Sequence, residues 1–420
     1  MKKSPIYIKS IEIENIKTFG EISRIDFEKL TGAFSQWTII LGDNGIGKST
    51  LLHCIAWMKP DQNIEINEEE APDLIINHQE NESLERLVRK KSNQGIIKAT
   101  FISGRKFSQS KTVKNFPQFS TTINIEVDKE RKLNDVKLRI ETKSPEVFKD
   151  KEVTIFCYSA SRVLGNANIT DTYMLDTIET FIEDRTILYD AEEILHTINY
   201  ARLGASEKEK TRYESYFNKV KALLVHVLPD VGNIKDIDVT SPKLVDGQMK
   251  QGEILLSTKH GKSIPFHEFS LGYKTVISWL IDLSWRLFNK YPESNDPLSE
   301  YAIVIVDEID LHLHPVWQRD IICNLSKVFP NVQFVASAHS PLMVQAAIEH
   351  NFAVLKFENE SVRIVNEPEG VDGWRIDQIL TSEIFGLESA RGREYDTLMN
   401  RRNLILQKKK ITNKECTSSN

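Results

Sequence analysis

Residues 6–15 alternate between apolar isoleucines and polar side chains, mostly at a period of two. Because successive side chains of a strand point to opposite faces, this period predicts a half-buried strand. Ile22, Ile25 and Phe27 indicate a second strand. The two together predict a small antiparallel layer, which precedes the first continuous apolar run at residues 37–41.

Longer patterns follow along the chain. Residues 50–58 have a helix-like pattern that Lys59-Pro60 ends, and residues 96–102 and 123–127 are typical of strands. The apolar runs 301–306 and 332–338 predict strands of a parallel sheet, buried on both faces. Between residues 171 and 230 glycines are few, and spacings of three and four predict helices that carry Ile178, Phe181, Ile182, Leu188, Ile194, Leu195 and Ile198.

Strand patterns return at residues 234–257, around a polar turn at 246–247. A long amphipathic helix follows, with Val276, Leu280 and Leu287 on its apolar face. No sustained heptad occurs, so the pattern does not predict a long coiled-coil arm. Helical spacing from Trp374 onward leads into a basic tail, and the polar chain after residue 411 is expected to lack regular structure.

The composition limits the class of protein. The chain of 420 residues carries 54 Lys and Arg against 60 Asp and Glu, so its net charge of -6 argues against a general polyanion binder. Four dispersed cysteines without a C-x-x-C pair argue against a zinc ribbon or a secreted disulfide framework. No apolar run reaches the ~20 residues of a membrane span, and the start of the chain has no apolar signal core. We therefore expect a soluble cytoplasmic protein without a membrane partner.

The charge is unevenly distributed. An acidic stretch at residues 65–85 is followed by a segment from Arg86 to Lys114 that holds nine basic and no acidic residues. Phe101, Phe107, Phe116 and Phe119 are interleaved with this segment or follow it, a mixture that could bind a nucleic-acid backbone and stack on bases. A solvated strand face with phenylalanines in the core explains the same residues at least as well.

Candidate chemistry begins at residues 42–49, which match G-x-x-x-x-G-K-[ST] between a strand and a helix. In that context backbone N–H groups face an anion at a helix N-terminus. We expect Lys48 to reach the β and γ phosphates and Ser49 to ligate Mg²⁺. The other nucleotide-binding candidates are Asn44, Gly45, Gly47 and Thr50.

Two acids end the apolar run at residues 301–306. Asp307 is expected to hold Mg²⁺ through water and Glu308 to polarise the attacking water. His339 follows the next buried strand and is a candidate sensor of the γ-phosphate, although a lone histidine there is more often structural. Asp310, with His312 and His314, could ligate a metal, but loop packing explains the three residues better because alternate side chains diverge.

The motifs in this order resemble the ATP-binding-cassette heads of the RecF, SMC and OLD group of AAA-type ATPases. The matches are Walker A at 42–49, a shortened signature at 269–273, Walker B at 303–308, a D-loop at 309–315 and a switch histidine, His339. Residues 307–315 look especially like the PtuA ATPases of Septu anti-phage systems and their retron-associated relatives. The resemblance implies an α/β fold: a mixed or parallel sheet with the phosphate loop, an antiparallel N-terminal layer and an inserted helical lobe.

The resemblance also implies ATP and Mg²⁺ as ligands and a composite site. Ser270 and Gly272 of one subunit would act in trans on the γ-phosphate held by Lys48 of another, which requires a homodimer or a higher even-numbered homo-oligomer. Taken alone, Ser270 before a helix is a weak sign, since any capped helix can carry it. The signature departs from that of transporters, with Leu271 and Tyr273 where they usually have Gly and Gln. Gln79 is the candidate for the Q-loop ligand of the metal.

We expect four parts: 1–165, the N-terminal ATPase lobe with Walker A and a basic β segment; 166–232, the inserted helical lobe; 233–365, the C-terminal ATPase lobe; and 366–420, a helical cap with a basic tail. The leading hypothesis is an ATP-driven dimeric switch in anti-phage defence that controls a separate effector such as a nuclease. The motifs form one catalytic set, and the D-x-D at 236–238 lies in a predicted strand, so a fused nuclease is not expected. The alternative is a RecF-like DNA-binding ATPase that uses residues 86–114.

Overall fold

The computed structural model describes residues 5–29, 34–59, 84, 86–104, 107, 116–142, 153–167, 177–245, 248–250, 252–366 and 373–417. The chain divides into two compact units, Met1–Glu369 and Gly370–Asn420. The Q-loop candidate Gln79 and the turn at 246–247 lie outside the described residues. Among the described residues, no helix is long and apolar enough to cross a membrane.

An antiparallel sheet contains the predicted N-terminal layer. Its order is β2-β1-β4-β5-β6, and β1 pairs with both β2 and β4. In β1 the predicted alternation buries Ile8, Ile11 and Ile13. The strands are β1 (Ile6–Glu14), β2 (Ser23–Asp26), β4 (Gln94–Ser103), β5 (Gln118–Val127) and β6 (Leu133–Thr142).

A second sheet carries the strands that end in candidate residues. Its order is β18-β17-β3-β16-β15-β7, and every neighbouring pair is parallel except β17 with β18. The central strands are fully buried, as their unbroken apolar runs predict. Its members are β3 (Trp37–Leu41), β7 (Ile155–Tyr158), β15 (Ala302–Val306), β16 (Val332–Ser337), β17 (Asn351–Glu358) and β18 (Ser361–Asn366).

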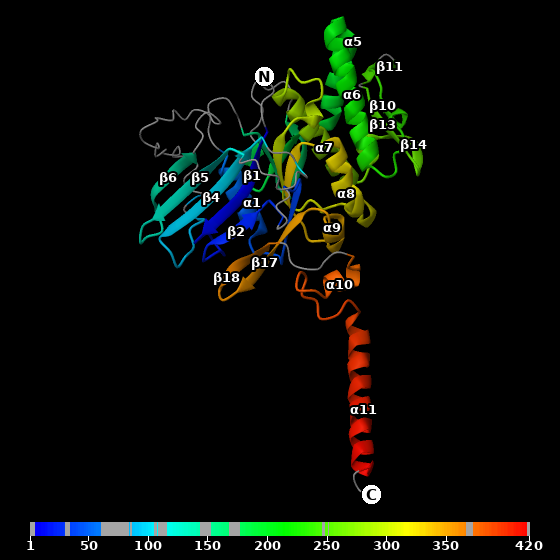
Figure 1. Cartoon of the computed structure of the whole chain (residues 1–420). Helices are drawn as coiled ribbons and strands as arrows, with labels where there is room; N and C mark the ends of the chain where they lie inside the picture. Colours follow the sequence, from blue (N-terminus) through cyan, green and yellow to red (C-terminus); the bar gives the residue numbers. More distant parts are fainter. Residues whose placement is uncertain are drawn as a thin grey trace. The chain divides into compact units, whose positions relative to one another are not determined.

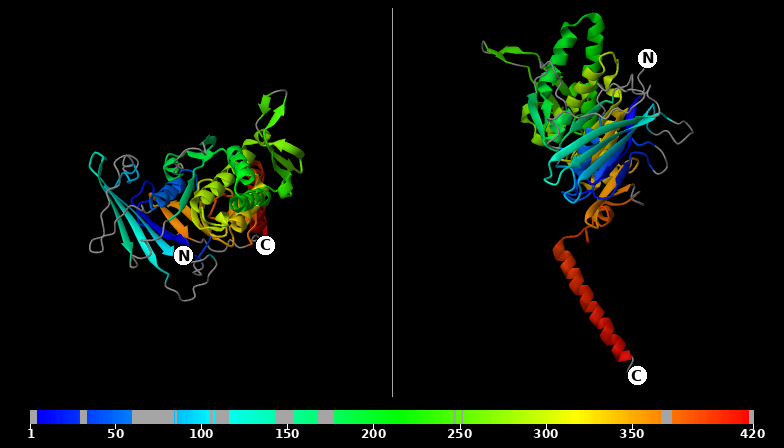
Figure 2. Two further views of the ribbon diagram at one scale, coloured as in Figure 1. Left: turned by 90° about the horizontal axis from the view of Figure 1, so that it is seen from above. Right: turned by 90° about the vertical axis from the view of Figure 1, so that its left-hand side faces the viewer.

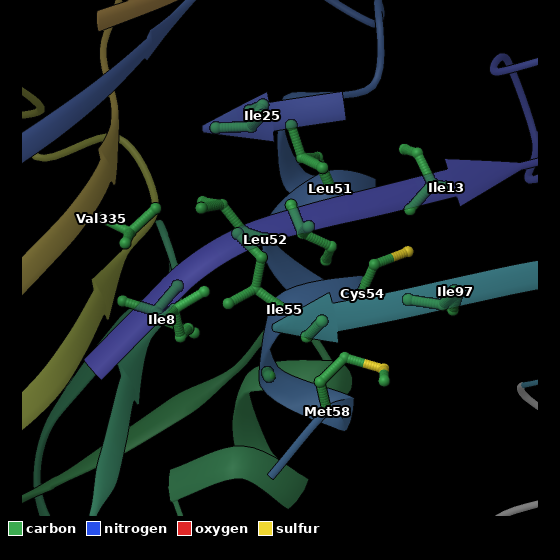
Figure 3. Close-up of a cluster of buried hydrophobic side chains, with 14 of the residues drawn as sticks. Ile8, Ile13, Ile25, Leu51, Leu52, Cys54, Ile55, Met58, Ile97 and Val335 are labelled. Carbon is green, nitrogen blue, oxygen red and sulfur yellow. The ribbon is translucent and has the colours of Figure 1, made fainter. Parts of the chain in front are cut away.

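Helix α1 (Lys48–Trp57) packs between the two sheets. Figure 3 shows Leu52 and Ile55 of this helix near Ile8 of β1, and Leu51 near Ile25 of β2. One hydrophobic cluster joins α1 to both sheets. A helix in such a place is apolar on most of its circumference, because each side faces protein. The phosphate loop is therefore attached to a helix that the core holds on several sides.

The remaining elements of the first unit lie mostly on the side opposite the antiparallel sheet (Figures 1 and 2). Residues 186–189, including Leu188, form a strand, so the expectation of helix there is wrong. This segment pairs with β8 (Arg162–Ala167) and buries Leu188 completely. The helices are α4 (Thr177–Ile182), α5 (Ala191–Gly204), α6 (Glu207–Val227), α7 (Leu271–Lys290), α8 (Pro315–Val328) and α9 (Pro341–Ala346).

Short strands complete the first unit, and the expected strands after residue 234 are present. They are β8 (Arg162–Ala167), β9 (Thr186–Tyr189), β10 (Ile237–Val239), β11 (Lys243–Val245), β12 (Gln248–Lys250), β13 (Ile254–Thr258) and β14 (Gly261–Pro265), with 3-10 turns Ile234–Asp236, Phe266–Glu268 and Pro297–Ser299.

The second unit contains α10 (Ile376–Leu380) and α11 (Arg393–Thr417). The expectation that the chain lacks regular structure after residue 411 is wrong, since α11 continues to Thr417. The preceding turns explain the difference, because Arg, Leu, Gln and Lys dominate residues 401–410 and are good helix formers, and extending an existing helix costs far less than starting one.

A buried ion pair fixes α7 in the first unit. Arg286 Nε donates to Asp282 Oδ2 at 2.6 Å, and both side chains are almost fully buried. Tyr158 Oη and the Tyr189 N–H donate to the same carboxylate. Burial lowers the pKa of Arg286, but attraction to Asp282 outweighs it and raises that pKa above its ordinary value. The pair thereby ties α7 to β7 and β9.

Replacing Asp282 with alanine removes the acceptor of three donors and leaves a buried guanidinium unpaired. We expect Asp282→Ala to lower the free energy of unfolding by about 3–5 kcal/mol, measured by chemical denaturation. Asp26→Ala is the matched control, because Asp26 pairs with Arg24 at the surface and its loss costs about 0–1 kcal/mol. Equal losses in the two variants would show that the buried pair contributes nothing special.

Candidate nucleotide-binding and hydrolysis site

The predicted site residues follow adjacent parallel strands. The phosphate loop follows β3, the two acids follow β15, and His339 comes two residues after β16, which lies between those strands. The carboxyl ends of parallel strands meet at one edge of a sheet, which is where ligands bind in such folds. The sheet order thus brings together the loop, Asp307, Glu308 and His339, which the sequence separates by nearly three hundred residues.

The phosphate loop has the backbone that its glycines predict. Gly47 caps α1 with a φ of 121°, and a Cβ there would lie 2.7 Å from Thr18 Oγ1. Glycine is therefore required at this position both by the backbone angle and by the space. The Thr18 hydroxyl donates to the carbonyl of Ile46 at 2.9 Å, which fixes the loop to the chain after β1.

Lys48 lies across the phosphate loop. Its ammonium donates to the carbonyls of Gly42 at 2.7 Å and Asp43 at 2.9 Å. Burial lowers the pKa of Lys48, and the nearby carboxylates of Asp307 and Glu308 oppose that shift. An ammonium held by neutral carbonyls can exchange them for phosphate oxygens, which carry full charge.

Asp307 accepts hydrogen bonds from the first turn of α1 and from the end of β16. Ser49 Oγ donates to its Oδ2 at 2.6 Å, and Ser337 Oγ donates to its Oδ1. The Asp307 N–H donates to the carbonyl of Tyr158 at 2.8 Å. A hydroxyl and a carboxylate oxygen side by side suit Mg²⁺, which prefers oxygen ligands. The residues present therefore fit the ion that the motif predicts.

Glu308 is held in an uncommon backbone conformation, with a φ of 47°. Its N–H donates to Ser337 Oγ at 2.8 Å, and its Oε1 lies 3.7 Å from His339 Nε2. Both side chains are about one-third exposed, so they border the solvent rather than the core. Asp310 Oδ2 accepts the N–H groups of His339 and Ser340, which fixes the turn that carries the histidine.

The signature residues lie at the start of α7. Ser270 is its N-cap, and the hydroxyl accepts from the Tyr273 N–H at 3.5 Å. Leu271 is 58 % exposed, so this helix end faces away from its own core. A Cβ on Gly272 would lie 2.8 Å from the carbonyl oxygen of His312, so glycine permits the contact between the signature and the D-loop.

The D-loop histidine His314 has a structural partner. His314 is the N-cap of α8, where its Nδ1 accepts from the Val316 N–H at 3.3 Å, and His312 has a φ of 65°. Across the described ranges, no cluster of three or more His, Cys, Asp and Glu suits a metal. These contacts favour loop packing over metal binding for this stretch.

The basic segment contributes to internal contacts as well as to the surface. Arg89 donates to the carbonyl of Glu360 at 2.6 Å, and Lys91 pairs with the Glu360 carboxylate at 2.6 Å. Phe101 and Phe119 stack in the core with ring centroids 4.9 Å apart. These contacts favour the interpretation of core phenylalanines for the two rings, and DNA binding by residues 86–114 stays a prediction.

Two residues of the site are absent from the sequence-based candidates. Arg162 Nη2 donates to the carbonyl of Asp307 at 2.7 Å, and burial lowers its pKa to about 10 despite the attraction of Asp307 and Glu308. Ser337 binds both Asp307 and the Glu308 N–H. Ser337 lies inside the predicted strand at 332–338, so a signal for it was available. Arg162 follows a short apolar run at 155–158, which does not indicate that it lies beside the two acids.

Comparison with known proteins gives consistent results. The chain is 24% identical over 396 residues to the Septu protein PtuA of Bacillus mycoides (strain KBAB4), which covers 93% of this chain and 45% of that protein, so the chain spans about half its length. It is 24% identical over 417 residues to the Retron Vc95 probable ATPase of Vibrio cholerae serotype O1 biovar El Tor, covering 87% and 77%.

An SMC head domain from Thermotoga maritima aligns with a TM-score of 0.41 and 15% identity, over 86% of this chain and 99% of that one. The family model described as an AAA ATPase domain matches residues 6–344. That match spans most of the chain, the phosphate loop and His339 included, so the protein belongs to the AAA ATPase domain family.

Proposed function

We propose that this ATPase is a dimeric switch that couples ATP binding and hydrolysis to a separate effector in anti-phage defence. The observation that supports the proposal is a pair of contacts at one edge of the sheet, Ser49 with Asp307 and Glu308 with His339. Lys48 lies beside Ser49 on the phosphate loop. The relatives named as a Septu protein and a retron ATPase support the defence context.

Each residue has a role in the proposed reaction. Lys48 and the N–H groups of the phosphate loop bind the phosphates of ATP, and Ser49 and Asp307 hold Mg²⁺, Asp307 through water. When bound, Mg²⁺ neutralises the charge that develops on the phosphate oxygens. Glu308 orients and deprotonates the water that attacks the γ-phosphorus, as the bond to the bridging oxygen breaks and ADP leaves. His339, beside Glu308, binds the γ-phosphate.

A second copy completes the site in this proposal. Ser270 and Leu271 are exposed at a helix N-terminus, where free N–H groups favour an anion. Contact between this helix end and the γ-phosphate of a partner makes dimerisation depend on ATP, so hydrolysis separates the pair. The effector, a nuclease in the leading hypothesis, would respond to the paired state.

Lys48→Ala should abolish ATP binding, because it removes the one ammonium that lies on the phosphate loop of the described structure. Isothermal titration calorimetry with ATP and Mg²⁺ measures the effect. Lys262→Ala is the control, since Lys262 is exposed on β14 and should leave the affinity unchanged. Comparable ATP affinity in Lys48→Ala and the native protein would exclude residues 42–49 as the nucleotide site.

Glu308→Gln should bind ATP normally but hydrolyse it about 10²-fold or more slowly, because the amide cannot accept the proton of the attacking water. Steady-state phosphate release gives the rate, and light scattering with ATP should show a lasting dimer. The exposed Glu349 provides the control variant, Glu349→Gln. Unchanged hydrolysis by Glu308→Gln would remove Glu308 from its role.

Mixing two inactive variants tests the composite site. In a dimer of Lys48→Ala with Ser270→Arg, one phosphate loop and one signature stay intact, and they meet at the same site only if the signature acts in trans. We expect equal mixtures to recover about one quarter of the native ATPase rate when the subunits exchange freely and the sites act independently. No recovery, despite mixed dimers shown by differential tagging, would place the signature in cis.

A further inference from the structure

Arg162, the first residue of β8, contacts the backbone of the two acids that follow β15. Its Nη2 donates to the carbonyl of Asp307 at 2.7 Å and approaches the carbonyl of Glu308 at 3.4 Å. A guanidinium offers several donors in a fixed plane, so one side chain can serve both carbonyls. Because both contacts are to carbonyl oxygens, they fix the orientation of the backbone at Asp307 and Glu308 and do not hold either side chain directly.

The Asp307 carbonyl and the Glu308 N–H belong to a single planar peptide unit. Arg162 holds its carbonyl, while Ser337 Oγ accepts its N–H at 2.8 Å. The plane is therefore clamped on opposite sides by two side chains from different strands. A rotation of this plane would break both hydrogen bonds at once.

The orientation of this plane sets the backbone of Glu308. Its φ of 47° lies in the left-handed region, which a residue with a Cβ adopts only when its surroundings impose it. Turning the plane over would return φ to the favoured negative range and redirect the carboxylate, whose Oε1 lies 3.7 Å from His339 Nε2. The clamp thus opposes the intrinsic preference of the chain.

The surroundings fix Arg162 itself. Just before it, Ser159 and Thr186 exchange two hydrogen bonds, from the Ser159 N–H to Thr186 Oγ1 at 2.7 Å and from the Thr186 N–H to Ser159 Oγ at 2.9 Å. The guanidinium carbon lies 5.7 Å from the ring centroid of Trp279 on α7, within the range of a cation–π contact. The chain just before Arg162 is thus tied to β9, and its guanidinium packs on the signature helix.

We propose that Arg162 is a positioning residue that holds the Asp307–Glu308 peptide in the orientation that ATP hydrolysis requires. The inference rests on the proposed function, because the orientation matters only if Glu308 serves the attacking water. If Arg162 had only a structural role, it would fill space next to Trp279, and its loss would destabilise the surrounding strands β7, β15 and β16 together. If Arg162 is a positioning residue, its loss changes the orientation of the Asp307–Glu308 peptide and leaves those strands intact.

Hydrogen exchange of the nucleotide-free protein tests whether Arg162 and Ser337 hold the Asp307–Glu308 peptide, and this measurement does not depend on ATP hydrolysis. In Arg162→Ala, the amide of Glu308 should exchange at least about tenfold faster, while amides of β7, β15 and β16 keep their native rates. Arg363→Ala is the matched control, an exposed arginine on β18. Native exchange at Glu308, or faster exchange throughout β7, β15 and β16, would overturn the proposal.

Kinetics give the second readout. Arg162→Ala should lower kcat by about 10–100-fold and change the dissociation constant for ATP by less than about threefold, as expected for a supporting residue. Millimolar guanidinium, far below denaturing concentrations, should restore part of the rate, and methylammonium should not. A native kcat, or equal rescue by both ions, would overturn the role of Arg162.

Two further variants separate a failure of the proposed role of Arg162 from a folding defect and from a failure of the proposed function. Arg162→Lys serves if the alanine variant does not fold. It should lower kcat without weakening ATP binding, because the lysine ammonium lacks the planar guanidinium that packs on Trp279 and is therefore not held in one orientation. A native kcat in this variant would then overturn the proposal. If Glu308→Gln instead hydrolyses ATP at the native rate, the proposed function fails, and the exchange rates still report whether Arg162 clamps the peptide.

Discussion

The carboxylate of Asp307 sits between two hydroxyls, one from the first turn of α1 and one from the end of β16. The side chain is only 5% exposed, so its charge would destabilise the fold without donors. Ser49 and Ser337 supply them, and both positions depend on the parallel register in which Val306 pairs with Ala336 and Ser337 with Ile40. A slip of one residue would turn Ser337 to the other face of the sheet. The register of the parallel strands therefore determines whether Asp307 has the hydroxyl donors that the site needs.

The core explains why this edge can be rigid. Helix α1 begins at Lys48 and packs between two sheets, and its buried side chains include Leu51, Leu52 and Ile55. A helix held on several sides cannot tilt independently, so its N-terminal N–H groups keep one direction relative to β3. The phosphate loop draws its preorganisation from this packing, in addition to its glycines.

Local patterns in the sequence predicted those parts of the site that neighbouring residues specify. The phosphate loop, the acids after β15 and His339 after β16 each follow a strand that its apolar run reveals. Arg162 could not be assigned in this way, because it meets the carbonyl of Asp307 across a separation of 145 residues. Its role depends on β7 lying beside β15, and strand order is a property of the whole fold. Leu188 shows the same limit, since its place in a strand depends on pairing with β8.

The signature and the two acids are also connected within one chain. Gly272, at the start of α7, leaves room for the carbonyl of His312 in the D-loop. The same loop carries Asp310, whose carboxylate holds the N–H groups of His339 and Ser340. A displacement of the α7 N-terminus would therefore press on the D-loop, and the D-loop determines where the backbone of His339 lies. Because close-packed contacts transmit displacement, the exposed end of α7 is mechanically linked to His339 of the same chain.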